Sequence, residues 1–330
     1  MIRLAMPVFV LVLGAAPAAA DLLIVLNKSD HQAALVDPAD HHVITKLATG
    51  QGPHEVAVTP DGRWAFVANY GVSGVFGNGE RHDEPGNTLT VLDLKSRKVA
   101  RTIQLEGFSK PHGIQASKNG ARIWVTSEVA KSVLEVDVKS GKILSTWPTS
   151  QEISHMVVAT PDEKKLYVAN IGSGSVTIID RKSGNVHSVT TAAGSEGIDV
   201  APNGREVWVT NRGANSISVI DVATDSVLAT FESGGEFPIR AKFTPDGKQV
   251  FVSNARSNEV VVFDAATRTP VGKVAVGVMP VGIQMEPSGR RAYVANTNDD
   301  KVTVIDVATR AVVTTFAPGK EPDGMGWARK

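Results

Sequence analysis

The sequence contains no cysteine among its 330 residues. This absence excludes disulfide bonds, thiolate metal ligands, cysteine nucleophiles and covalent attachment of haem. Charge is balanced as well, because 34 lysine and arginine residues stand against 34 aspartate and glutamate residues, and no basic run of five or more occurs. Nucleic acid is therefore not an expected partner, since phosphate neutralisation supplies most of the affinity of non-specific nucleic-acid binding.

Several catalytic motifs are missing too. No G-x-S-x-G elbow lies between a strand and a helix, which argues against a serine hydrolase. Neither a phosphate-binding P-loop nor a dinucleotide-binding glycine motif occurs. These absences leave binding proteins and enzymes of other chemistry.

A long apolar run occurs only at the start of the chain. Arg3 is followed by an apolar segment from Leu4 to Leu13 and by three alanines that end at Ala20, the pattern of a secretory signal peptide. A membrane anchor would need about 18 or more continuous apolar residues, and this run is shorter. We expect residues 1–20 to be a signal peptide and the mature chain, without a membrane span, to be periplasmic or secreted.

What the sequence does contain is a repeat. A short apolar segment ending in Asn or Ser recurs seven times, as IVLN, FVAN, WVTS, YVAN, WVTN, FVSN and YVAN. In six of these units an aspartate follows ten residues later, at Asp37, Asp137, Asp180, Asp221, Asp264 and Asp306. In the second unit the distance from Asn69 to Asp93 is 24 residues, which corresponds to an insertion of 14. Elsewhere the period is about 42 residues, typical of a repeat architecture.

The pattern inside each unit is that of β-strands. In segments such as SISVID and VTVID apolar and polar residues alternate, and Val and Ile are frequent. Turn sequences such as TPDG and KSG lie at the ends of these segments. The aspartate fits an Asx turn that caps backbone N–H groups. Four short strands in each of seven units predict an all-β, seven-bladed β-propeller over residues 21–330, with the insertion at about 70–87.

The two ends of the chain predict how the ring closes. The first repeat begins directly with its second strand, LLIVLN, whereas the C-terminal segment EPDGMGWA supplies one strand more than its own repeat needs. We therefore expect the last strand to complete the first blade as its innermost strand. A closed ring buries its own edges, so we expect a monomer.

The segments YVAN, WVTN and FVSN, followed by VTVIDVAT and by P-x-G-I-x-x-x-P-x-G, resemble the YVTN family of seven-bladed β-propellers. The resemblance covers essentially the whole mature chain, with Ser127 in the position of the Asn as one departure. It implies the fold and an extracytoplasmic location. It implies little about chemistry, because propellers serve as binding scaffolds, lyases, lactonases and redox domains alike.

Propeller geometry brings one residue of each repeat to one mouth of the central channel. The innermost strands all start at that mouth, and the x position of P-x-G gives seven residues, hereafter the first ring: His54, His112, His155, Glu196, Ile239, Val281 and Asp323. Three imidazoles with a carboxylate are a suitable ligand set for zinc, iron or copper, and protonated histidines could bind an anion. The alternative is a polar mouth that simply faces water, with histidines too far apart for metal bonds of about 2.0–2.1 Å.

Further polar residues belong to the same face. The insertion, YGVSGVFGNGERHDEPGN, carries Arg81 and His82 and is either a lid or an inert surface loop. Arg212 and Arg256 lie in loops between second and third strands, and Arg240 lies one residue past the first ring. These arginines could contact carboxylate or phosphate groups.

Two classes of function remain. A propeller that binds a small molecule, a cofactor or a periplasmic protein at the channel mouth agrees with the neutral charge and the missing motifs. The alternative is a metal-dependent enzyme. By analogy with streptogramin-type lyases, which also carry P-H-x-I segments, His54, His112 or His155 would be the general base, and Glu196 or Asp323 a metal ligand. A lactonase, or a haem-d1-like redox domain with a ring histidine as axial ligand, is a further variant.

Overall fold

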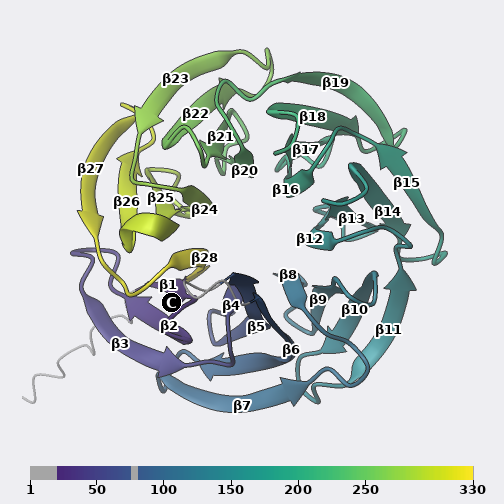
Figure 1. The fold of residues 1–330 in the computed structure, drawn as a ribbon, viewed down its shortest axis with the longest axis vertical. Helices are drawn as coiled ribbons and strands as arrows, with labels where there is room; N and C mark the ends of the chain where they lie inside the picture. The colour runs from purple at the N-terminus through teal and green to yellow at the C-terminus, as the bar shows by residue number, and fades with distance from the viewer. Residues whose placement is uncertain (1–20, 76–80, 330) are drawn as a thin grey trace, which may run out of the picture.

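The computed structural model describes residues 21–75 and 81–329, so the expected signal peptide lies outside the described residues. Twenty-eight strands form seven four-stranded sheets, arranged as blades around a central channel (Figure 1). A single 3-10 turn, Thr297–Asp299, is the one helical element in the described ranges. Within those ranges no helix is long and apolar enough to cross a membrane. The predicted all-β, seven-bladed propeller is confirmed.

Within blades 2 to 7, four consecutive strands run from the channel outwards. Blade 2 comprises β4 (Pro53–Val58), β5 (Trp64–Val75), β6 (Arg81–Asp93) and β7 (Lys98–Gln104). Blade 3 comprises β8 (Pro111–Ala116), β9 (Arg122–Ser127), β10 (Ser132–Asp137) and β11 (Ile143–Pro148). Blade 4 comprises β12 (Ser154–Ala159), β13 (Lys165–Asn170), β14 (Ser175–Asp180) and β15 (Val186–Thr190). Blade 5 comprises β16 (Ser195–Val200), β17 (Glu206–Asn211), β18 (Ser216–Asp221) and β19 (Ser226–Glu232). Blade 6 comprises β20 (Pro238–Phe243), β21 (Gln249–Asn254), β22 (Glu259–Asp264) and β23 (Pro270–Ala275). Blade 7 comprises β24 (Pro280–Met285), β25 (Arg291–Asn296), β26 (Lys301–Asp306) and β27 (Ala311–Phe316).

Blade 1 joins the two ends of the described chain. It consists of β28 (Pro322–Ala328), β1 (Leu22–Asn27), β2 (Gln32–Val36) and β3 (Val43–Ala48). β28 pairs antiparallel with β1, with Leu23 opposite Trp327 and Val25 opposite Met325. Figure 1 shows the yellow C-terminal strand beside the purple N-terminal one. The predicted ring closure by the last strand is therefore confirmed.

Burial follows the position of each strand in its blade. Second strands such as β13 are buried along nearly their whole length, because neighbouring blades cover both faces. Fourth strands such as β19 contain only partly buried and exposed residues, because one face meets water. Trp124 and Trp208 are fully buried. Burial of each large apolar side chain contributes roughly 1.5–3 kcal/mol to the free energy of folding.

The repeated polar residues are structural. Asp221 Oδ1 accepts the N–H of Thr224 at 2.7 Å, which is the expected Asx turn. Asn211 Oδ1 accepts from Ser195 Oγ at 3.0 Å, and its Nδ2 donates to Ser218 Oγ at 3.0 Å. Asn211 thus connects the inner strands of its blade, and Asn170 does the same through Ser154 and Thr177. The shorter Ser127 bonds only the loop before its inner strand, through Ser109.

Candidate functional site at the channel mouth

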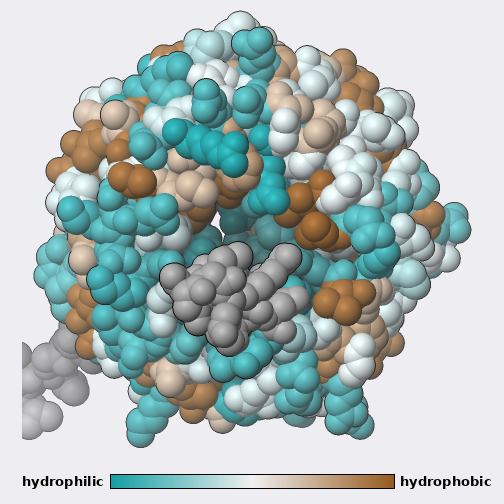
Figure 2. Space-filling view, in the orientation of Figure 1, coloured by the Kyte–Doolittle hydropathy of each residue, from teal (hydrophilic) through white to brown (hydrophobic). Residues whose placement is uncertain are grey.

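The first ring lies where the sequence placed it. Each member is the second residue of its innermost strand, and these seven strands surround the channel (Figure 1). Figure 2 shows mostly hydrophilic surface around the central opening. His112, Glu196 and Asp323 are nonetheless buried, with 5%, 6% and 7% of their surface exposed. The polar members of the ring therefore contact one another more than they contact water.

The three histidines lie side by side. The ring centroids of His54 and His112 are 4.9 Å apart, and those of His112 and His155 are 3.6 Å apart in a stacked arrangement with an interplanar angle of 30°. Tyr70 lies against the same group, 4.7 Å from His54 between ring centroids. The imidazoles of three successive blades thus form one cluster.

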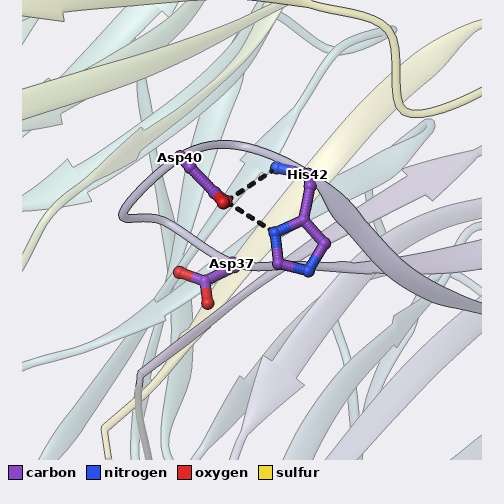
Figure 3. Close-up of side chains that lie close together, drawn as sticks. All are labelled: Asp37, Asp40 and His42. Carbon is purple, nitrogen blue, oxygen red and sulfur yellow. Dashed lines mark hydrogen bonds and ion pairs between the residues drawn. The ribbon is translucent and has the colours of Figure 1, made fainter.

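This cluster is not arranged as a ready three-ligand metal site. In the part of the chain that the structure describes, one group of three His, Asp or Glu residues has ligand atoms all within 4.8 Å of one another, and it is Asp37, Asp40 and His42 (Figure 3). There Asp40 Oδ1 lies 2.6 Å from His42 Nδ1, and Asp37 Oδ1 accepts the N–H of Ala39. That group is the exposed turn between β2 and β3, and its hydrogen bonds account for its geometry.

A second ring of residues surrounds the first. It is formed by the residue that directly follows the terminal Asn or Ser of each second strand: Lys28, Tyr70, Glu128, Ile171, Arg212, Ala255 and Thr297. Of these, our sequence analysis selected only Arg212. The signal was available, because every member occupies the same position of the repeat.

Charged and polar members of the two rings form a continuous chain across blades 2 to 5. Tyr70 Oη donates to Glu128 Oε2 at 2.6 Å, and Glu128 Oε1 lies 2.6 Å from His155 Nδ1. His155 Nε2 lies 3.6 Å from Glu196 Oε1. Glu196 Oε2 in turn lies 2.8 Å from Arg212 Nη1. Glu128 and Glu196 therefore hold His155 between two carboxylates.

These contacts give the three histidines different protonation. Burial alone would lower the pKa of His155, but its contacts with Glu128 and Glu196 outweigh burial and raise the pKa to about 9. Burial lowers the pKa of His54 to about 4. Burial, and next the charge of His155, lower the pKa of His112 well below its usual range. At neutral pH the cluster thus contains one imidazolium and two neutral imidazoles.

The ring nitrogens of the two neutral histidines differ in their partners. His54 Nδ1 lies 2.8 Å from the carbonyl oxygen of Gly52, so neutral His54 carries its proton on Nδ1 and keeps Nε2 as an acceptor. His112 Nδ1 is buried and has no hydrogen-bond partner among the described residues. A buried polar atom without a partner costs free energy and marks a place where a ligand atom or water can bind.

Asp323, a candidate metal ligand alongside Glu196 in the sequence analysis, has a cationic neighbour. Its Oδ2 lies 3.2 Å from Lys28 Nζ. Burial would raise the pKa of Asp323, but Lys28 and then His54 outweigh it and lower that pKa. The pair lies between His54 and the apolar residue Val281 in the order of blades, so it ends the polar part of the ring.

Arg240, a predicted ligand contact, lies one residue past the first ring and pairs with Glu55. The two residues come from blades 6 and 2, so the pair connects distant blades across the channel, and their side chains are only 10% and 12% exposed. Burial would lower the pKa of Arg240, but the carboxylates of Glu55, Asp323 and Glu196 outweigh it and raise that pKa. A cavity of about 520 Å³ borders this pair, lined also by Gln115 and Lys242.

The remaining predicted contacts lie on loops. Arg256 is exposed, and its guanidinium carbon lies 4.2 Å from the ring centroid of Phe237. Arg81 and His82 belong to β6, where they pair with Val75 and Gly74 of β5 in an extended hairpin. The side chains of Arg81 and His82 lie outside the described part of the structure, so their role as ligand contacts stays a prediction.

Comparison with known proteins shows similarity to lactonase-type propellers. Residues 185–270 match the family model described as lactonase, 7-bladed beta-propeller. Similar solved structures include hydrazine synthase from Kuenenia stuttgartiensis, at 22% identity and a TM-score of 0.76 over 87% of this chain and 92% of that one. Comparison with curated protein sequences gave no significant match.

Two further structures have functional titles. The periplasmic gluconolactonase PpgL from Pseudomonas aeruginosa is 20% identical, with a TM-score of 0.74 over 94% of this chain and 99% of that chain. The dihydro-heme d1 dehydrogenase NirN, in complex with DHE, is 16% identical, with a TM-score of 0.67 over 92% of this chain and 65% of that chain. At these identities the likeness shows the fold alone.

Proposed function

We propose that the protein binds a small molecule at the channel mouth and that the residues His54, His112, His155 and Glu196, hereafter the histidine arc, form the polar part of the site. The observation that carries this proposal is the chain of buried polar contacts around His155, which joins side chains of four successive blades. Burying a network of charged and polar groups costs free energy. Where the fold does not need such a network, its presence indicates a functional role.

The repeat itself supplies the comparison that supports a functional role. Blades 6 and 7 place Ile239 and Val281 where the histidine arc places His or Glu, and blade 6 places Ala255 where blade 3 places Glu128. These blades have the same four-stranded sheets as the others. The fold therefore accepts apolar side chains at these positions, and the charges of the histidine arc are not required to build a blade.

The histidine arc suits a ligand with oxygen atoms. Protonated His155 and Arg212 carry hydrogen-bond donors, His54 Nε2 is an acceptor, and His112 Nδ1 is a buried nitrogen without a partner among the described residues. A carbonyl, hydroxyl or carboxylate group can use such a mixed set. The ligand class that these groups support is therefore a small oxygenated molecule.

Hydrolysis of a lactone is a second candidate function, favoured by the unpartnered His112 Nδ1 beside protonated His155. In this reaction His112 would take a proton from water while the water oxygen attacks the lactone carbonyl. The ring C–O bond would break, and the leaving alkoxide would take a proton from His155. The family match over residues 185–270 and the likeness to PpgL support testing this reaction.

A divalent metal such as zinc, iron or copper on His54, His112 and His155 is the remaining alternative. The contact of His54 Nδ1 with the Gly52 carbonyl favours it, because metal-binding histidines usually donate their other N–H to such a partner. The imidazole rings would have to turn to bring three nitrogens onto one ion. Metal analysis of purified protein, before and after chelation, tests this alternative.

We also propose that the chain is exported, acts as a monomer and belongs with YVTN-type propellers, on the basis of its N-terminal segment and its repeated motifs. Cell fractionation and the mass of the mature protein test export. Retention of a folded, unprocessed chain in the cytoplasm would contradict it. Light scattering tests the monomer.

The test of the proposed function is ligand binding in matched variants. Thermal-shift screening and calorimetry would use a panel of small carboxylic acids, sugars and lactones. We expect a compound that stabilises the wild type to lose most of this effect in His112→Ala and Glu196→Gln. Arg290→Gln, in an exposed turn, is the control. An unchanged shift in both mouth variants would contradict the proposal, and hydrolysis of glucono-1,5-lactone that His112→Ala abolishes would favour the second candidate.

A further inference from the structure

One side of the mouth is apolar. Blades 6 and 7 contribute Ile239 and Val281 to the first ring, and Ala255 follows in the second ring. Phe237 and Met279, which precede the inner strands of these blades, pack against the same buried cluster. We call these five residues the apolar arc. Val278, beside Met279, is 43% exposed, so the apolar character of this side reaches the surface.

A cation is fixed at the edge of the apolar arc. The guanidinium group of Arg256 lies over the Phe237 ring at 4.2 Å. Arg256 is exposed and has no carboxylate within ion-pair distance among the described residues. A guanidinium stacked on an aromatic ring keeps its N–H groups free at the edge of its plane, where they can bind both oxygens of a carboxylate.

The apolar arc and the histidine arc meet at Arg212. Its guanidinium carbon lies 5.2 Å from the Phe237 ring centroid, while Nη1 contacts Glu196 at 2.8 Å. Arg212 is therefore occupied by Glu196, whereas Arg256 on the same aromatic ring is available to an anion. A molecule above the mouth would meet hydrogen-bonding groups on one side and hydrocarbon with a positive charge on the other.

We propose that the ligand is an amphipathic carboxylate, with an apolar body against the apolar arc and its carboxylate on Arg256. This inference rests on the proposed function, because it specifies the ligand of the same mouth. A purely polar molecule, such as a sugar acid, would place its hydroxyl groups against the apolar arc. These hydroxyl groups would lose their bound water and gain no hydrogen bonds in return. An apolar body removes hydrocarbon surface from water instead.

The test compares three probes on the full mature chain. 2-Naphthoate has an apolar body and a carboxylate, 2-naphthol lacks the carboxylate, and gluconate lacks the apolar body. We expect 2-naphthoate to bind at least about tenfold more tightly than either of the others. Arg256→Gln should weaken 2-naphthoate by about tenfold and leave 2-naphthol nearly unchanged. Val281→Ser should weaken both naphthyl probes.

Controls separate this inference from the proposed function. Arg290→Gln removes an exposed arginine of another loop and should change no affinity, and circular dichroism checks that each variant is folded. Gluconate binding as tight as 2-naphthoate binding, with loss in His112→Ala, would overturn the inference and keep the proposed function. Absence of 2-naphthoate binding also overturns the inference. Failure of every probe and of the wider panel would count against both proposals.

Discussion

The histidine arc and the apolar arc occupy equivalent positions of one repeat but differ in chemistry. On one side of the mouth His112 and Glu196 are buried with 5% and 6% exposure, and on the other Ile239 and Val281 are buried with 7% and 9% exposure. Similar burial with opposite polarity shows that backbone geometry does not decide which type of side chain is found there. Mutations on each side can therefore separate what the fold needs from what binding needs.

The energetic difference between the arcs is substantial. Apolar residues in the mouth gain free energy as they leave water, whereas each buried ion must recover its lost hydration from partners. His155 recovers it from two carboxylates, and Glu196 from His155 and Arg212. The histidine arc is stable as a set, and its members depend on one another.

The largest expected effect on stability comes from deleting β28, the strand that lies between the two arcs. Deleting residues 321–330 removes β28, which carries Asp323 and supplies the innermost strand of blade 1. We expect the whole ring to lose cooperative folding, because the edge of β1 and the cores of blades 1, 2 and 7 become exposed. Differential scanning calorimetry measures this, and an unchanged melting temperature would refute closure by β28.

A smaller effect is expected where the two sides are joined across the channel. Arg240→Met leaves Glu55 buried without its cation, which should lower the free energy of unfolding by about 3–5 kcal/mol. The double variant Glu55→Leu with Arg240→Met should recover most of this loss, because no unpaired charge remains. Urea denaturation measures both. A loss of stability that is the same in the single and the double variant would show that the ion pair is not the cause.

The smallest effect is a pH dependence that belongs to the histidine arc alone. The pKa of His155 is raised to about 9 in the folded protein, above its ordinary value of 6.5. Its contribution to stability, at most about 3 kcal/mol, is therefore complete below pH 6.5 and lost as pH rises through 9. The groups that face it are Glu128, Glu196 and the neutral His54 and His112.

Comparison with His155→Gln isolates that contribution. The difference in unfolding free energy between wild type and variant should shrink between about pH 6.5 and 9, because Gln does not titrate there. Denaturant titrations at several pH values, with NMR of the imidazole, measure it. A constant difference over this range would show that His155 is not held as a cation.

Much of the fold could be predicted because it repeats. The Asn and Asp positions recur at a fixed distance, so strand order, the second-blade insertion and the closing strand followed from alignment of one unit with the next. The first ring followed for the same reason, since each member directly follows the start of an inner strand. In a repeat protein, each unit contacts mainly its neighbours, so the overall arrangement follows from the pattern within one unit.

The contacts between rings could not be obtained in this way. Whether His155 meets Glu128, and whether Arg240 meets Glu55, depends on side-chain conformations and on the width of the channel. Tyr70 and Lys28 occupy the same repeat position as Arg212, but neither residue type alone indicates a contact with the first ring. The repeat shows that the residues after the terminal Asn or Ser are equivalent, and the arrangement of the blades shows which first-ring residues they contact.

The most direct test replaces the buried charges of the histidine arc with the residues of the apolar arc. In one variant, His112→Val, His155→Ile, Glu196→Val, Glu128→Ala and Arg212→Ala would be combined, so that no charge of these ion pairs is left without its partner. Our account predicts a folded propeller with a free energy of unfolding at least equal to that of the wild type and no ligand binding at the mouth. An unfolded ring, or unchanged binding of a ligand identified with the wild type, would contradict it.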